Sequence, residues 1–300
     1  MGSAEARIKS LTLPRPTNGD RPTERDRRSH GDRPSERGPA HGDRPLQRGP
    51  AHGDRRSRRG RPELWVCNLG TVEYREALGL QERLRAARQH NELPDLLLLL
   101  EHPPVYTRGR RSGEGELPMG EDWYRTQGIE IVDTDRGGKV TYHGPGQLVG
   151  YPITRISDVV AYLRTLERAL ATALAEEGIP ARARPEDGPD YTGVWVQDRK
   201  IASLGVHVAR GVTTHGFAVN VENDLQPFGW VVPCGLDGVR MTSLIKETGC
   251  LNGQMKCFRR RVAWQVAEVL GCRQRLVSPA QLASRAPAPE FLPSPLAAGV

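Results

Sequence analysis

The chain has 300 residues and a formal net charge of +7, but this charge is unevenly distributed. Residues 1–62 carry 16 basic and 8 acidic side chains, whereas residues 63–300 carry 27 and 28. The basic character therefore belongs to an N-terminal tail, which argues against a nucleic-acid-binding face on the rest. No run of 18 apolar residues and no signal peptide is present, so neither a membrane span nor secretion is expected.

The N-terminal tail is repetitive. An 11-residue unit, HGDRPSERGPA, starts at His30 and recurs with changes at His41 and His52. Each unit contains glycine and lacks an apolar stripe, which favours disorder over a packed helix. We expect a disordered arginine-rich tail over residues 1–62, one folded domain over 63–277 and a flexible C-terminal tail over 278–300.

The folded part is expected to alternate irregularly between strands and helices. Three segments have apolar residues at spacings of three and four, the period of one helix face. These apolar positions are Ala77, Leu80, Leu84 and Ala87; Val159, Leu163, Leu166, Leu170 and Ala173, closed by Gly178; and Phe258, Val262, Val266 and Val269. Strands are expected over residues 64–69, 95–101, 130–133, 140–142, 147–153, 193–196, 200–208 and 213–221. Runs of strands with helices between them indicate an α+β fold, a mixed sheet backed by helices.

The segment from Arg136 to Leu148, RGGKVTYHGPGQL, has the most distinctive composition. Its four glycines surround a Thr-Tyr-His core. Such glycines allow the backbone to turn sharply and to approach a ligand closely. Its Gly-Pro-Gly spacing matches no phosphate-binding loop, and no other segment matches one. Nucleotide chemistry and a nucleotide cofactor are therefore not expected.

Lys200 opens an apolar strand-like segment, KIASLGVHV. In a regular strand it would share a face with Ala202, Leu204, Val206 and Val208. A lysine on an apolar face is costly unless it is paired or neutral. The alternative is a strand-end lysine that reaches solvent.

Cys234 lies between proline and glycine, where a turn could expose a thiol to a substrate. The five cysteines are scattered and odd in number, which fits a reducing cytoplasm. Neither Cys250 nor Cys257 has further ligands at zinc spacing, so no metal site is expected. Cys234 could equally be a small buried apolar residue, and a nucleophilic role requires a neighbour that lowers its pKa.

Three partners for that thiol remain open: Lys200, His143 and His215. His143 lies among glycines in an expected loop, which suits a substrate-facing role. His215 would lie on the same face of the expected strand as Phe217 and Val219, which favours a hydrogen-bonded core histidine. The small residues at 203–205 and 216–218 leave room for a slender acyl chain, or serve close packing.

Four separated motifs together resemble the lipoyl(octanoyl) transferases of lipoate biosynthesis. They are RGGKVTYHGPGQLVGYPI, KIASLGVHV, HGFAVNV and the PCG turn, in the order and at the spacing of that family. The match extends from about residue 63 to 270. The resemblance implies the fold shared by lipoate and biotin protein ligases. It also implies transfer of an octanoyl group from acyl carrier protein to the lysine of a lipoyl domain, without a cofactor or metal.

The resemblance also assigns roles to residues. Cys234 would carry the acyl-thioester intermediate, and Lys200 would lower its pKa and act as acid and base. The substrate pocket would be lined by Arg136, Gly137, Gly138, Lys139, Val140, Thr141, Tyr142, His143, Ser203, Leu204, Gly205, Gly216, Phe217 and Ala218.

The expected partners follow from the same resemblance. They are octanoyl–acyl carrier protein as donor, and lipoyl domains of 2-oxoacid dehydrogenase complexes and the glycine cleavage H protein as acceptors. We expect a cytoplasmic monomer that binds neither nucleic acid nor membrane. Because both protein partners are acidic in this family, a basic rim could steer them, formed by Arg108, Arg110, Arg111, Arg136 and Lys139.

Three other activities remain as alternatives. An ATP-dependent lipoate or biotin ligase would act without Cys234. A cysteine thioester hydrolase would pair Cys234 with His143 or His215 and release free acid. A nucleic-acid-binding protein would depend on residues 1–62 and on salt.

Overall fold

The computed structural model describes residues 60–113, 115–231, 239–250 and 253–285. Most of the predicted N-terminal tail, Cys234 and residues 286–300 lie outside the described residues. Within the described ranges, an eight-stranded mixed sheet has the strand order β10-β8-β9-β6-β2-β1-β11, with β7 pairing to β8. The strands are β1 (Glu63–Thr71), β2 (Asp95–Glu101), β6 (Gln147–Ile153), β7 (Gly193–Val196), β8 (Arg199–Ala209), β9 (Val212–Asn220), β10 (Arg240–Met241) and β11 (Arg273–Val277).

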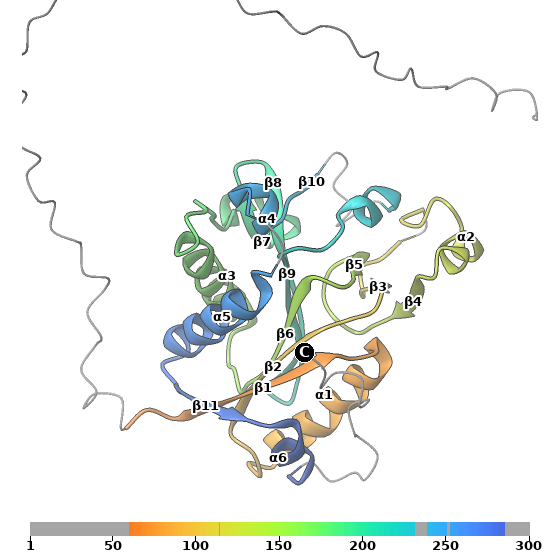
Figure 1. Ribbon diagram of the computed structural model, residues 1–300. Coiled ribbons are helices and arrows are strands. Elements are labelled where there is room, and N and C mark those ends of the chain that lie inside the picture. The colour runs from red at the N-terminus through yellow and green to blue at the C-terminus, as the bar shows by residue number, and fades with distance from the viewer. Residues whose placement is uncertain (1–59, 114, 232–238, 251–252, 286–300) are drawn as a thin grey trace, which may run out of the picture. The chain divides into compact units, whose positions relative to one another are not determined.

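Helices cover both faces of this sheet (Figure 1). Helices α3 (Val159–Ala175) and α5 (Met255–Val269) lie on one face. Helices α1 (Tyr74–Gln89) and α6 (Pro279–Ala283) lie on the other. The expected α+β fold with a mixed sheet backed by helices is therefore confirmed.

Strand β2 shows why a continuous apolar run suits the centre of this sheet. It pairs in parallel with β1 and antiparallel with β6. Leu97 and Leu99 belong to the core under α3 and α5, whereas Leu96, Leu98 and Leu100 belong to the core under α1. Because both faces are buried, every position of β2 between its polar ends is apolar.

A second, three-stranded sheet has the order β4-β3-β5. Its strands are β3 (Val105–Arg108), β4 (Glu130–Asp133) and β5 (Thr141–His143), and the short helix α2 (Glu121–Thr126) precedes β4. Tyr106, Tyr124, Tyr142 and Phe228 form an aromatic core here. The remaining short elements are 3₁₀ turns at Pro185–Asp187, Pro189–Tyr191 and Gln226–Trp230, and helix α4 (Leu244–Thr248).

Helix α3 differs in part from the predicted apolar stripe. Val159 is 40% exposed, because it occupies the first turn beyond the edge of the core. Asp158 caps this turn by accepting from the backbone N–H groups of Val160 and Ala161. The buried side also includes Glu167, whose carboxylate accepts from the backbone N–H of Gly193 at 2.7 Å. This buried acid is satisfied by that bond and by an ion pair with Arg164.

Regular structure continues beyond residue 277, the predicted end of the folded domain. Ser278 and Gln281 form a capping box that starts helix α6. Leu282 in this helix is 1% exposed and joins the core beneath α1. The flexible tail expected from the high content of proline, alanine and serine therefore does not begin at residue 278. The capping box and one buried leucine are enough to form a helical turn over residues 279–283.

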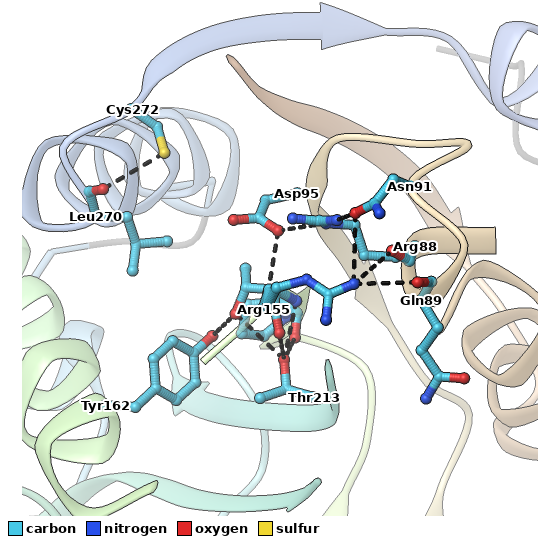
Figure 2. Close-up of polar contacts among 11 residues, drawn as sticks. Arg88, Gln89, Asn91, Asp95, Arg155, Tyr162, Thr213, Leu270 and Cys272 are labelled. Carbon is cyan, nitrogen blue, oxygen red and sulfur yellow. Dashed lines mark hydrogen bonds and ion pairs between the residues drawn. The ribbon is translucent and has the colours of Figure 1, made fainter. Parts of the chain in front are cut away.

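Polar contacts connect the end of α1 to the sheet (Figure 2). Asp95 at the start of β2 accepts from the guanidinium of Arg88 at 2.7 Å and from the backbone N–H of Arg155 at 3.1 Å. Nearby, the hydroxyl of Thr154 donates to that of Tyr162 at 2.8 Å, and Thr213 donates to the backbone of β6. These bonds hold β6, β9 and α3 together at the end of the sheet away from the residues 136–143.

Candidate active site

A cavity lies where residues 136–143 pass over strands β8 and β9. It brings together thirteen of the fourteen residues that the resemblance places in a substrate pocket, together with Lys200. The lining residues are Tyr74, Arg111, Arg136, Gly137, Gly138, Lys139, Val140, Thr141, His143, Tyr151, Pro189, Asp190, Thr192, Lys200, Ser203, Leu204, Gly205, His215, Gly216, Phe217 and Ala218.

Glycines at the floor of the cavity permit very close backbone contacts. The backbone N–H of Gly137 donates to the carbonyl of Val206 at 3.1 Å. A Cβ atom on Gly205 would lie 2.7 Å from the carbonyl oxygen of Gly137, which is too close for any side chain. One on Gly216 would clash with the backbone of Gly150. These two strand glycines therefore let the loop and the neighbouring strand approach the floor.

Arg136 is anchored rather than free. It is 8% exposed, and its guanidinium donates to the carbonyl of Thr107 at 2.6 Å and to the hydroxyl of Thr107 at 2.8 Å. It also donates to the carbonyl of Gly137 at 3.0 Å. The guanidinium thus fixes the glycine turn on strand β3 and places a positive charge beside the cavity.

Tyr142 is the one predicted pocket residue that does not line the cavity. Successive side chains of a strand point to opposite faces, so Thr141 and His143 line the cavity while Tyr142 faces away. Its ring packs against Tyr106 at 5.4 Å and against Phe228 at 5.5 Å between centroids. Tyr142 supports the wall of the cavity from behind.

Lys200 does not share a face with Ala202, Leu204, Val206 and Val208, as a regular strand would require. Trp195 pairs with Lys200 and Val194 with Ala202, so Ile201 is an extra residue in β8. This β-bulge turns Ile201 and Ala202 to the core under α3 and leaves Lys200 on the cavity side.

The environment of Lys200 is closed and partly aromatic. The residue is 2% exposed, and its Nζ lies 5.2 Å from the centre of the Trp195 ring. The backbone of Gly193 is close to the end of the side chain, where a Cβ atom would lie 2.5 Å from Cε. The alternative of a lysine that reaches solvent is therefore excluded, and the side chain of Lys200 faces the cavity.

His215 is a hydrogen-bonded buried histidine, as its strand position predicts, although it also lines the cavity. Its Nε2 lies 2.6 Å from a carboxylate oxygen of Asp135. Because a carboxylate only accepts, Nε2 carries the proton. Burial lowers the pKa of His215, whereas its hydrogen bond lowers the pKa of Asp135 to about 2. His215 is therefore neutral at neutral pH, because its ring is almost fully buried.

Two further histidines stand beside it. Nδ1 of His143 lies 2.7 Å from the amide oxygen of Gln147, and Nδ1 of His102 lies 2.6 Å from the carbonyl of Val72. Burial holds the pKa of His143 well below its usual range and lowers that of His102 to about 4. Both rings are therefore neutral at neutral pH.

Sequence patterns gave no indication of several lining residues. Tyr74 begins helix α1 and Tyr151 lies within strand β6, about 80 residues apart in sequence, and both look like ordinary core aromatics. Asp190 and Thr192 come from a 3₁₀ segment with no periodic pattern. Tyr74 stacks on His143 with ring centroids 5.9 Å apart, which only the three-dimensional arrangement reveals.

Two arginines of the predicted basic rim are neutralised by acidic residues. Arg108 forms ion pairs with Asp133 and Glu121, and Arg111 pairs with Asp190 at 2.9 Å. Arg136 is buried on Thr107. The acidic partners of these arginines come from segments that have no sequence pattern linking them to the rim, so counting basic residues overestimated its charge.

Cys234 lies outside the described residues, but the chain on both sides of it is placed. Before it, the carbonyl of Trp230 accepts from the hydroxyl of Tyr124 at 2.5 Å. After it, Met241 pairs with Lys200 in the parallel β10–β8 contact, and the N–H of Thr242 donates to the carbonyl of Lys200 at 3.0 Å. The chain that follows the segment containing Cys234 therefore lies directly beside Lys200.

In the parts of the chain that the structure describes, no cluster of three or more histidine, cysteine or acidic side chains could hold a metal ion. Within the same ranges, no helix is long and apolar enough to cross a membrane.

Residues 73–266 match the family described as the lipoyl protein ligase A/B catalytic domain. An octanoyltransferase of Solibacter usitatus is 51% identical over 172 residues, which make up 56% of this chain and 76% of that protein. An octanoyltransferase of Caldicellulosiruptor saccharolyticus is 42% identical over 221 residues, covering 72% of this chain and 92% of that protein.

Solved structures show the same fold. The crystal structure of lipoate-protein ligase A bound with ATP aligns with a TM-score of 0.59 and 19% identity, over 75% of this chain and 92% of that chain. A bipartite lipoate protein ligase from Thermoplasma acidophilum aligns with a TM-score of 0.59 and 18% identity, over 75% and 91%. At these identities the likeness concerns the fold alone, and it confirms the lipoate-ligase architecture.

Proposed function

Because this chain belongs to the lipoyl(octanoyl) transferases of the lipoyl protein ligase A/B family and is an acyltransferase, we propose a specific course for its reaction. An octanoyl group passes from octanoyl–acyl carrier protein to Cys234 and then to the lysine of a lipoyl domain. The acceptors are lipoyl domains of 2-oxoacid dehydrogenase complexes and the glycine cleavage H protein. The reaction is the first step of endogenous protein lipoylation, in the cytoplasm.

The position of Lys200 is the observation that carries this proposal. The bulge in β8 directs Lys200 to the cavity, and β10 brings the chain that follows Cys234 alongside it. An ammonium at Lys200 would stabilise a thiolate at Cys234 and so lower the pKa of that thiol.

The first half-reaction exchanges one thioester for another. The Cys234 thiolate attacks the octanoyl carbonyl, a new C–S bond forms, and the C–S bond to the carrier breaks. The departing carrier thiolate takes a proton from Lys200, which acts as the acid. No ATP is needed because the thioester is already activated.

The second half-reaction forms the amide. The lysine amine of the lipoyl domain attacks the Cys234 thioester, a C–N bond forms and the C–S bond breaks. Lys200 in its neutral form accepts the proton released from the amine. Negative charge develops on the carbonyl oxygen in both steps, and backbone N–H groups near Leu204 or Gly205 stabilise it.

The octanoyl chain is accommodated by the small residues of the floor. Gly205 and Gly216 face each other across β8 and β9, and Ser203 faces Ala218. The backbone of Gly137 and Gly150 fills the space directly above the two glycines, so the slender alkyl chain lies over the small side chains of Ser203 and Ala218, which line the cavity. Phe217 and Leu204 border these small side chains and provide apolar contact.

Intact mass spectrometry tests the covalent intermediate. The full chain is mixed with octanoyl–acyl carrier protein, alongside Cys234→Ser and the control Cys257→Ser, which changes an exposed cysteine. The proposal expects one octanoyl adduct that hydroxylamine removes and a lipoyl domain accepts, in the native chain and in Cys257→Ser only.

Other outcomes identify the alternatives. Transfer that requires free octanoate and ATP, without an adduct, would establish the ligase. Release of free octanoate while a lipoyl domain is present would establish the hydrolase.

A further inference from the structure

A chain of amide side chains runs behind the cavity from strand β9 to His143. The Nδ2 of Asn220 donates to the carbonyl of Thr242 at 3.0 Å. Its Oδ1 then accepts from Nε2 of Gln147 at 3.0 Å. The oxygen of Gln147 lies 2.7 Å from Nδ1 of His143. All three of these side chains are buried.

The direction of every bond in this chain is fixed by backbone carbonyls. The Thr242 carbonyl can only accept, so the amide nitrogen of Asn220 must face it. Gln147 likewise donates from Nε2 to the carbonyl of Tyr142 at 3.2 Å. Its other atom, Oε1, is therefore an acceptor, and Nδ1 of His143 must carry the proton that it receives. Nε2 of His143 is consequently an unprotonated nitrogen with a lone pair.

His143 differs in this respect from the two neighbouring histidines. In His102, Nδ1 faces the Val72 carbonyl and Nε2 lies 2.7 Å from the hydroxyl of Tyr151. In His215, Nε2 is bound by Asp135, and Nδ1 lies 3.5 Å from the hydroxyl of Tyr74. Both nitrogens of each of these rings thus face a partner.

Nε2 of His143 has no hydrogen-bond partner within the described ranges. The ring lines the cavity with Nδ1 engaged by Gln147 behind it, so Nε2 is the acceptor left for a ligand. Burial, which lowers the pKa of His143 well below its usual range, keeps this nitrogen unprotonated at neutral pH.

The chemistry of the two substrates indicates which of them this lone pair serves. The octanoyl chain and its thioester carbonyl have no hydrogen to donate, whereas the incoming lysine amine has. The tetrahedral adduct formed by that amine must also lose a proton before the amide is complete.

Resting on the proposed function, we propose that Gln147 and Asn220 hold His143 in the Nδ1–H tautomer, so that Nε2 binds the acceptor amine and takes its proton. The neutral amine donates a hydrogen bond to Nε2, which directs the nitrogen lone pair to the thioester carbonyl. The C–N bond forms, the N–H proton moves to Nε2, and the sulfur leaves as thiolate. The imidazolium then passes the proton on to neutral Lys200, which replaces the proton that Lys200 gave to the carrier thiolate. His143 thus takes the proton first, and Lys200 is its final acceptor.

The tautomer is measured first, on the full native chain. Nitrogen-15 NMR of the histidine rings distinguishes a protonated from an unprotonated ring nitrogen. The inference expects His143 to show a protonated Nδ1 and an unprotonated Nε2 at neutral pH. A protonated Nε2 in the native chain would overturn it.

The two half-reactions are then timed separately with Gln147→Met and His143→Gln. Formation of the octanoyl adduct should stay within about twofold of the native rate. Transfer from the preformed adduct to a lipoyl domain should fall by about 100-fold in His143→Gln and by at least about tenfold in Gln147→Met. Equal slowing of both half-reactions would show a merely structural role and contradict the inference.

Tyr162→Phe is the matched control, because it removes a buried hydrogen bond to Thr154 outside the cavity. It should leave both half-reactions unchanged. If Gln147→Met fails to fold, the nitrogen-15 spectrum of the native chain tests the inference instead. Addition of a lipoyl domain should shift the Nε2 signal of His143. A lipoyl domain whose acceptor lysine is replaced by methionine should leave that signal unchanged. Absence of any octanoyl adduct in the native chain would instead refute the proposed function, whatever the tautomer.

Discussion

The contact between the loop at residues 136–138 and strand β8 gives the sharpest prediction, through the substitution Gly205→Ala. The added Cβ would lie 2.7 Å from the carbonyl oxygen of Gly137, whereas an ordinary contact begins at 3.4 Å. The loop must therefore move outward by about 0.7 Å. That movement strains the hydrogen bond from Gly137 to the Val206 carbonyl.

Three contributions set the expected loss of stability. Overpacking costs about 1–3 kcal/mol, and loss of the Gly137 hydrogen bond costs about 1 kcal/mol. Alanine restricts the unfolded chain and offsets roughly 0.4–1 kcal/mol of this. The free energy of unfolding should therefore fall by about 2 kcal/mol. Because the displaced loop lines the cavity, kcat/KM should fall by about tenfold or more.

Denaturant unfolding and steady-state transfer assays measure the two effects, with Gly79→Ala as the control. Gly79 lies on helix α1, where a Cβ would meet only the end of Arg83 at 3.5 Å. Alanine there should raise the free energy of unfolding by about 0.5–1 kcal/mol and leave transfer unchanged. A Gly205→Ala protein with native stability and native kcat/KM would refute the packing argument.

Three further perturbations test other parts of the molecule. Lys200→Met should lower the rate of octanoyl adduct formation by about 100-fold or more, measured by stopped reaction and mass spectrometry, and a native rate would remove Lys200 from the mechanism. Asp135→Asn should lower the free energy of unfolding at neutral pH, and the difference between this variant and the native chain should shrink as pH falls. The native pKa of Asp135 is depressed from 3.8 to about 2, chiefly by the His215 hydrogen bond. Its contribution is therefore present above about pH 4 and is lost towards pH 2 in denaturant titrations. Leu282→Ala should lower the free energy of unfolding by about 2–3 kcal/mol, whereas an unpacked tail would show no change.

The sequence was sufficient where a single local pattern determines the structure. The apolar run of residues 95–101 and the helical spacing of Leu80 and Leu84 correspond to β2 and α1. The small residues at 205 and 216 indicated either room for an acyl chain or close packing, and the contacts of both glycines show close packing. Each of these features depends on side-chain size or periodicity within a few residues.

Other features depend on contacts that no local pattern records. The pairing of β7 with β8 shifts by one residue at Ile201. This shift places Lys200 on the cavity side of β8, opposite to Ala202. The chain of hydrogen bonds from Asn220 to His143 links residues 77 positions apart, and Gln147 connects them. The motif resemblance placed Tyr142 in the pocket, but alternation of side chains within β5 turns it to the opposite face.

The pairing of β1 with β11 has a consequence for synthesis and truncation. Glu63 pairs with Arg273 and Cys67 with Val277, so the first strand of the domain acquires its outer neighbour only after more than 200 further residues are made. Until then one edge of β1 is without its partner, and an open strand edge is a template for pairing with another chain. Shortening the protein to residue 272 should therefore yield aggregates during expression rather than a slightly weakened enzyme, even though every residue that lines the cavity would still be present.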